Sequence, residues 1–66
     1  MTLLQIPGGR RATVENGAWR DQPGLAIGVD QQPDAQGRMV TVGYTVVLDG
    51  PGGKTVYLPA RCVKLL

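Results

Sequence analysis

The sequence predicts an all-β fold, and three observations carry this prediction. Ten glycines and five prolines divide the 66 residues into short segments, at the spacing of about ten residues that is typical of short strands. Several of these segments alternate apolar and polar residues, which is the period of a half-buried strand. No longer stretch places apolar side chains at helical spacing without a glycine or proline inside it, so helix is confined to about one turn.

The first predicted strand covers residues 11–15 and ends at a tight turn. Its residues alternate, with Ala12 and Val14 on one face and polar side chains on the other. Asn16 and Gly17 follow directly, and these residue types tolerate the positive φ of a tight turn. The strand therefore ends at a chain reversal.

A loop over residues 18–23 connects this turn to a second predicted strand over residues 24–30. That strand alternates three apolar side chains on one face with the small residues Ala26 and Gly28 on the other. Small side chains suit close approach by another strand or another chain. The second strand therefore has one face that a neighbour can approach closely.

The longest predicted strand covers residues 38–48, after a polar turn over residues 31–37. Apolar side chains occupy one of its faces along the whole length. Gly43 in the middle predicts a bulge or bend, which lets one long strand serve two sheets of a barrel. Residues 49–53 then close a hairpin onto the next strand.

The remaining chain predicts two short strands with a 3₁₀ turn between them. Residues 54–58 form the first strand, and residues 59–62 fit one 3₁₀ turn because proline pre-sets the first helical φ. Residues 63–66 return as a closing strand. Five short strands with a 3₁₀ turn before the last are the plan of an SH3-like barrel. The main rival, the OB-fold, usually needs a longer chain and a helix between its third and fourth strands.

We assign residues 10–66 to this barrel and residues 1–9 to an N-terminal apolar arm. Leu3, Leu4 and Ile6 are apolar beyond what five strands require. They form either an arm that packs on a neighbouring subunit or a sixth strand. A chain of this size buries only about 60% of the surface that its unfolded form exposes, so a homo-oligomer is a reasonable expectation.

The composition excludes several kinds of site. Cys62 is the single cysteine and histidine is absent, so an intrachain disulfide is impossible and zinc lacks its usual ligands. The five carboxylates are scattered along the chain. We therefore expect no catalytic residue, no metal and no cofactor. Neither a signal peptide nor an apolar run of the roughly 20 residues that span a membrane is present, so we expect a cytoplasmic protein without a membrane partner.

Residues 13–30 contain a short strand pattern of alternating residues, a glycine turn, a loop with aromatic and basic residues, and a second alternating strand pattern. The positions that define this pattern are Val14, Gly17, Arg20, Gly24, Ile27, Val29 and Asp30. The pattern resembles the KOW motif of ribosomal and transcription-elongation proteins, whose loops contact RNA or a partner protein. The resemblance implies that Trp19, Arg20 and Gln22 make such contacts. Asp21, beside Arg20, is a departure from a phosphate-binding loop.

A second resemblance covers most of the chain. It is carried by Asn16-Gly17-Ala18-Trp19, Gly43-Tyr44-Thr45-Val46, Pro51-Gly52 and Tyr57-Leu58-Pro59-Ala60. These runs are similar to the layout of the small plasmid-borne type II dihydrofolate reductases, which are SH3-like barrels that work as tetramers around a central pore. That family carries Val-Gln-Ile-Tyr before its proline, whereas Val56 and Leu58 replace the glutamine and the tyrosine here. The resemblance therefore implies the scaffold and an oligomer, but not reductase activity.

Two features leave alternatives open. The indole of Trp19 is either a platform for a base or a peptide, or a lid over the end of the barrel core. Five cations are either one basic patch or charges that solvate separate strand faces, since the net charge is only +2. These cations are Arg10, Arg11, Lys54, Arg61 and Lys64.

Together these features predict a non-catalytic binding module that contacts RNA, DNA or a nucleoprotein assembly. The predicted surface joins the loop 18–23 to the turn 31–37 and the hairpin 50–53. The predicted ligand-binding residues are Trp19, Arg20, Gln22, Arg11 and Arg61.

Two other hypotheses belong to different classes. The chain is alternatively a protein-interaction or self-assembling module, in which Tyr44, Tyr57 and the apolar N-terminus bury against another chain. The third hypothesis is a pore-forming, reductase-like oligomer, which Val56 and Leu58 disfavour.

Overall fold

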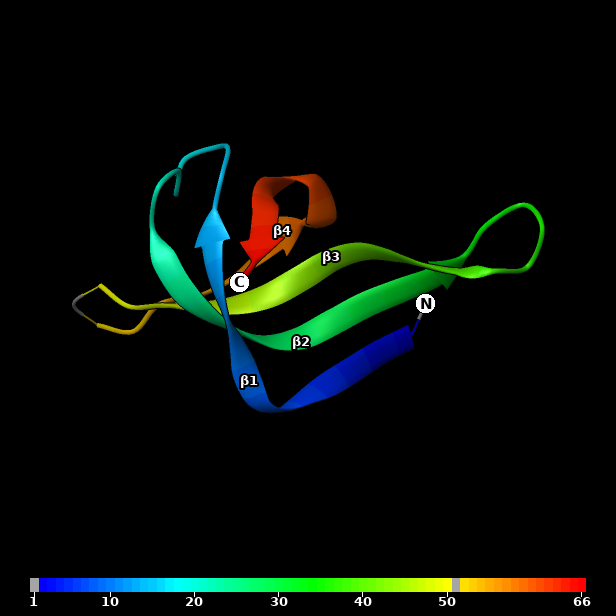
Figure 1. The fold of residues 1–66 in the computed structure, drawn as a ribbon, viewed down its shortest axis with the longest axis horizontal. Helices are drawn as coiled ribbons and strands as arrows, with labels where there is room; N and C mark the ends of the chain where they lie inside the picture. The colour runs from blue at the N-terminus through cyan, green and yellow to red at the C-terminus, as the bar shows by residue number, and fades with distance from the viewer. Residues whose placement is uncertain (1, 51) are drawn as a thin grey trace.

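A computed structural model describes residues 2–50 and 52–66, and it confirms an all-β fold (Figure 1). Five antiparallel strands form one curled sheet in the order β4-β3-β2-β1-β5. The elements are β1 (Thr2–Val14), β2 (Pro23–Pro33), β3 (Met39–Leu48), β4 (Thr55–Pro59), the 3₁₀ turn η1 (Ala60–Cys62) and β5 (Val63–Leu65). The five strands and the 3₁₀ turn before the last strand are those predicted from the sequence. Within the described residues, no helix has the length and apolar character that a membrane crossing requires.

The first strand is longer than predicted, and the assignment of residues 1–9 to a separate arm is wrong for residues 2–9. These residues form the first half of β1. The reason is that β2 continues to Pro33, past its predicted end, and offers ladder partners to β1 there: Leu3 pairs with Asp30 and Leu4 with Val29. Met1 lies outside the described residues.

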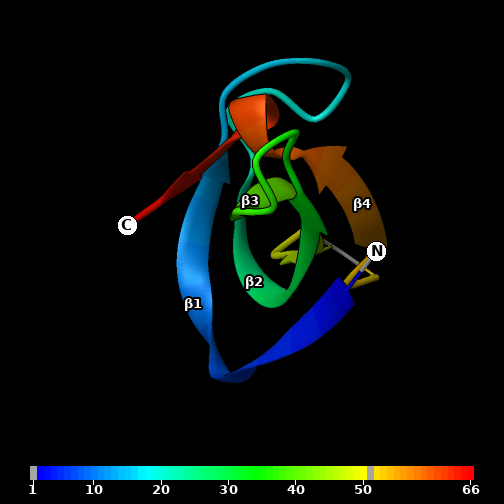
Figure 2. The ribbon, with the colours of Figure 1, turned by 90° about the vertical axis from the view of Figure 1, so that its right-hand side faces the viewer.

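The sheet turns a corner where β1 kinks. Residues 6–9 of β1 have only Ile27 of β2 opposite them, because the paired residues jump from Gln5 to Arg10. Gly8 and Gly9 adopt φ of 72° and 71°, which side chains other than glycine rarely tolerate. Figures 1 and 2 show the resulting sharp bend in β1. The kink lets one strand contribute to two differently oriented parts of the sheet.

Two bulges bend the neighbouring strands. Ile27 is the extra residue of β2 against β3, and Val42 is the extra residue of β3 between the pairs of Asp30 with Gly43 and Gln31 with Thr41. The bulge predicted at Gly43 is therefore present in β3, with the extra residue at the neighbouring Val42. The bulge at Ile27 also separates Ala26 from Gly28, which were expected to share a face. Their β3 partners, Val46 and Thr45, are consecutive residues and so point to opposite faces.

The core lies inside the curl and is built from small and medium side chains. Its members are Ala12, Val14, Ala26, Val46, Leu48, Leu58 and Val63. Ala26 is fully buried, and a Cβ at neighbouring Gly24 would lie 2.7 Å from Cγ1 of Val46 and 2.8 Å from the carbonyl oxygen of Val47. The face of β2 that carries Gly24 and Ala26 is therefore the core face, because β3 lies too close there for larger side chains.

The curl does not close through strand pairing. In the described part of the chain, β4 pairs only with β3 and β5 only with β1. The turn η1 connects these two edge strands, and Leu58 of β4 and Val63 of β5 meet in the same core. The fold is therefore a half-barrel whose two edges are joined by side-chain packing and one turn.

The close approach at Gly24 predicts a stability difference between two glycine substitutions. Gly24→Ala would force the β2 and β3 backbones apart, and we expect it to lower the free energy of unfolding by about 1–3 kcal/mol, the range for overpacked cores. Gly50→Ala is the matched control, because a Cβ there meets no atom within 4 Å. Urea unfolding measures both changes. Equal midpoints for the two variants would contradict the packing described here.

Candidate functional site

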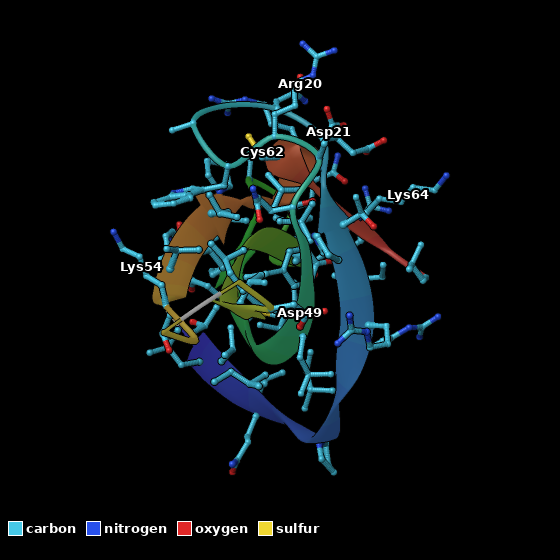
Figure 3. The ribbon with its side chains drawn as sticks, turned by 90° about the vertical axis from the view of Figure 1, so that its left-hand side faces the viewer. Arg20, Asp21, Asp49, Lys54, Cys62 and Lys64 are labelled. Atoms are coloured by element: carbon cyan, nitrogen blue, oxygen red, sulfur yellow. The ribbon has the colours of Figure 1, made fainter. Side chains whose placement is uncertain are left out.

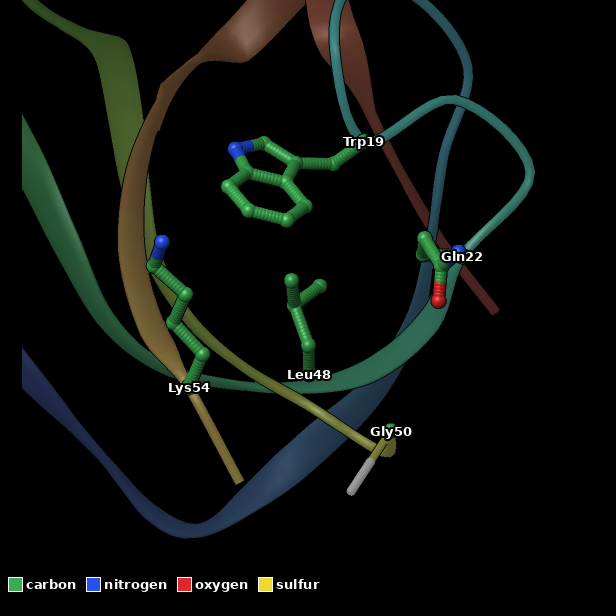
Figure 4. Close-up of a pocket in the computed structure, with 5 residues that line it drawn as sticks. All are labelled: Trp19, Gln22, Leu48, Gly50 and Lys54. Atoms are coloured by element: carbon green, nitrogen blue, oxygen red, sulfur yellow. The ribbon is translucent and has the colours of Figure 1, made fainter. Parts of the chain in front are cut away.

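A hollow at one end of the half-barrel is the candidate binding site. It has a volume of about 230 Å³ and is lined by Trp19, Gln22, Leu48, Gly50 and Lys54. Figure 4 shows the Trp19 indole on one side of the hollow, with the Leu48 side chain facing it and Lys54 and Gln22 flanking the two. The hollow therefore combines an aromatic surface, an aliphatic surface, an amide and an ammonium group.

Backbone hydrogen bonds hold the loop that carries Trp19 and Gln22. The Val14 amide donates to the Gln22 carbonyl over 3.0 Å, and the Asp21 amide donates to the Val14 carbonyl over 2.8 Å. Asp21 adopts φ of 66°, a left-handed conformation that aspartate tolerates better than most residues. These bonds tie the loop to the end of β1, so Trp19 is positioned by the core strand.

The side chain of Trp19 also contacts the core. It is half-buried and packs against the buried cluster inside the curl. The packing therefore confirms that Trp19 covers part of the core, as the lid interpretation predicted. The same ring lines the hollow, so one surface of Trp19 contributes to stability while another stays available to a ligand.

The hairpin between β3 and β4 supplies the opposite wall. The Leu48 amide donates to the Lys54 carbonyl over 2.8 Å, and the Asp49 amide donates to the Pro23 carbonyl over 3.0 Å. The second bond ties the hairpin to the start of β2, beside the Trp19 loop. Lys54 Nζ then lies 4.6 Å from the centroid of the Trp19 ring, within the range of a cation–π contact.

The structure brings together two of the five predicted site residues. Trp19 and Gln22 line the hollow. Arg20 adjoins Trp19, but its side chain is 73% exposed, lies 3.7 Å from the Asp21 carboxylate and points away from the barrel in Figure 3. Arg61 is an exposed residue of η1 whose carbonyl accepts a 3.3 Å hydrogen bond from Asn16 Nδ2.

Arg11 is engaged elsewhere. Its guanidinium donates two hydrogen bonds to the Asp49 carboxylate, and this contact holds the pKa of Asp49 below its ordinary value of 3.8. The ion pair neutralises Arg11 on the outer face of β1. Arg11 therefore contributes little net charge to a ligand surface.

Of the two alternatives left open for the five cations, the single basic patch is wrong. Lys54 and Lys64 point to opposite sides of the molecule in Figure 3, because Lys54 follows the β3–β4 hairpin and Lys64 pairs with Thr13 along β5. Lys54, together with Leu48, is instead part of the hollow, although neither was predicted to bind a ligand. The signal available in the sequence was that Lys54 directly follows the hairpin predicted to form the binding surface.

The predicted surface is also wrong in one of its three segments. Figure 1 shows the turn between β2 and β3 at one end of the long axis and the hairpin between β3 and β4 at the other. The molecule is 41 Å long, so the turn cannot share a surface with the hollow. The loop carrying Trp19 and the β3–β4 hairpin do lie side by side.

A buried carboxylate lies outside this site. Asp30 is 5% exposed, and its Oδ2 accepts a 2.8 Å hydrogen bond from the Tyr57 hydroxyl. The Tyr57 side chain reaches Asp30 across Gly43, where a Cβ would collide with the phenol. The hydrogen bond to Asp30 and burial raise the pKa of Tyr57 above its ordinary value of 10.0.

Removal of this hydroxyl is expected to destabilise the fold. Tyr57→Phe leaves Asp30 without a donor on Oδ2, while Oδ1 is buried and has no hydrogen-bond partner within the described residues, so the melting temperature falls at pH 7. The stabilisation is complete below pH 10 and decreases as pH rises through the raised pKa of the folded state. Melting curves from pH 7 to 11 measure this. The native protein and Tyr57→Phe should converge at the alkaline end, and a constant gap would contradict the assignment.

The core contact of Trp19 makes a separate prediction. Trp19→Ala should lower the free energy of unfolding by about 2 kcal/mol or more, as expected for loss of a large packed side chain. Trp19→Phe keeps a ring on the core and should lose less. Urea unfolding followed by circular dichroism compares the two. An unchanged midpoint for Trp19→Ala would remove the packing role.

Comparison with protein-family models, curated proteins and solved structures finds no match. The resemblances to the KOW motif and to the type II reductases therefore stay predictions. The chemistry of the hollow carries the functional argument.

Proposed function

We propose that the chain is a non-catalytic module that binds single-stranded nucleic acid, with one base in the hollow beside Trp19. The observation that carries the proposal is the arrangement of an indole, an amide and an ammonium group around a space of about 230 Å³. Ligand sites for drug-sized molecules usually exceed about 300 Å³. The hollow therefore suits one flat group rather than a whole cofactor.

Each lining side chain has a role in this proposal. Trp19 and Leu48 offer apolar surfaces between which a base can stack, and stacking on an aromatic ring contributes about 1–3 kcal/mol per base. Gln22 carries both donors and an acceptor, which match the polar edge of a base. Lys54 is exposed, and its ammonium group can contact the adjoining phosphate.

The mild charge of the protein favours a short ligand. Three arginines are paired with nearby aspartates, in the pairs Arg11 with Asp49, Arg20 with Asp21 and Arg38 with Asp34. Few cations are left to follow a long phosphate backbone. We therefore expect weak binding of one or two nucleotides through stacking, with a shallow dependence on salt.

A titration of the native protein with short single-stranded oligonucleotides tests the proposal. Trp19 is the only tryptophan, so its fluorescence reports directly on the hollow, and we expect quenching on binding. Lys54→Gln should weaken binding and reduce the slope of log affinity against log salt by about 0.7, the value for one phosphate contact on a single strand.

Lys64→Gln is the matched control. It removes the same charge from an exposed position on β5, on the other side of the molecule (Figure 3), and should leave the slope unchanged. Equal effects of the two substitutions would mean that only net charge matters. No quenching with any oligonucleotide would overturn the proposal and leave the protein-interaction hypothesis in its place.

A further inference from the structure

The N-terminal half of β1 has an open hydrogen-bonding edge. Residues Thr2 to Gln5 pair with β2 on one side. On the other side β5 reaches only Ala12, Thr13 and Val14. In the described part of the chain, no other backbone bond to residues 3–9 is present. The N–H and C=O groups on the outer side of residues 3–6 are therefore available to another strand.

Residues 2–6 of this edge lack the features that usually prevent pairing between molecules. Natural sheets protect their edges with charged side chains, prolines or bulges. Residues 2–9 contain no charged residue, and Pro7 interrupts only the end of the segment. Leu3 is 70% exposed and Leu4 is 46% exposed. An uncharged strand with exposed leucines is a template for a further strand.

We propose that a second copy of this chain occupies the edge, so that the β1 strands of two copies pair antiparallel about a two-fold axis near Leu4. Charge selects this partner: two uncharged segments can lie side by side without repulsion, whereas a charged segment would find no opposite charge here. A two-fold pairing is also closed, since the same edge is used by both copies. The sheets of the two copies then join across the axis into one longer sheet.

The pairing leaves the candidate binding site free. Figure 1 shows the start of β1 towards the end of the long axis opposite the β3–β4 hairpin, and Lys54 and Gly50 belong to that hairpin end. In the dimer the two hollows therefore lie apart from the two-fold axis. Self-association and ligand binding can be tested separately, because neither uses the residues of the other.

Sedimentation equilibrium of the full chain tests the proposal. We expect the native protein to have twice the 7.0 kDa mass of one chain. Leu4→Lys and Leu4→Glu should each have the single-chain mass, because the two-fold axis brings two like charges together. An equimolar mixture of the two variants should regain the double mass, because the charges facing each other are then opposite.

Leu66→Lys is the matched control and should keep the double mass. Leu66 is 62% exposed and follows β5, well apart from the start of β1 in Figures 1 and 2. A native protein with the mass of a single chain would overturn the proposal and leave the edge for a strand of a different protein. A mixture of the two Leu4 variants that stays at the single-chain mass would also overturn it, even if the native protein is dimeric, because the dimer would then use another surface.

Discussion

The close approach of β2 to β3 inside the curl is the constraint on which the rest of the structure depends. Gly24 and Ala26 leave room for Val46 and Leu48, and larger side chains would push the strands apart. The core that results is made of alanines, valines and leucines and is thin. Because little apolar surface can be buried there, peripheral residues such as Trp19 are recruited to extend it.

That recruitment links stability to the candidate site. The Trp19 ring serves the core and also forms a wall of the hollow. Its loop is tied to Val14, which is 1% exposed, and the facing hairpin is tied to the start of β2. Both walls are thus attached to core strands. A ligand would meet a preformed surface, which lowers the entropic cost of binding.

The kink in β1 leaves one edge of the sheet without a partner strand. Pro7, Gly8 and Gly9 turn the first half of β1 away from β5, so that among the described residues this half pairs with a strand on one side only. The same geometry that lets one strand serve two parts of the sheet exposes an uncharged edge. A small half-barrel can gain burial there through a second molecule, which it cannot gain by enlarging its own core.

Patterns that act over a few residues were enough to predict most of the strands. The alternation of Ala12 with Val14, the turn at Gly17 and the proline before η1 each depend on neighbouring residues, and each is found in the structure. Ala26 also predicted close approach by a neighbouring strand, because the small size of a side chain can be read from the sequence itself.

Pairing between distant segments could not be predicted in this way. Whether residues 2–9 form an arm or a strand depends on how far β2 extends, and the bulge at Ile27 reverses the face of Gly28. The candidate site shows the same division. Trp19 and Gln22 stood out in the sequence as aromatic and polar residues of one loop. Only the folded structure places Lys54 beside them and pairs Arg11 with Asp49. The sequence by itself determined the strands and turns, because these are set by local conformational preference. Only the tertiary structure decided which side chains and edges meet, because register and curvature arise from packing between residues far apart in the chain.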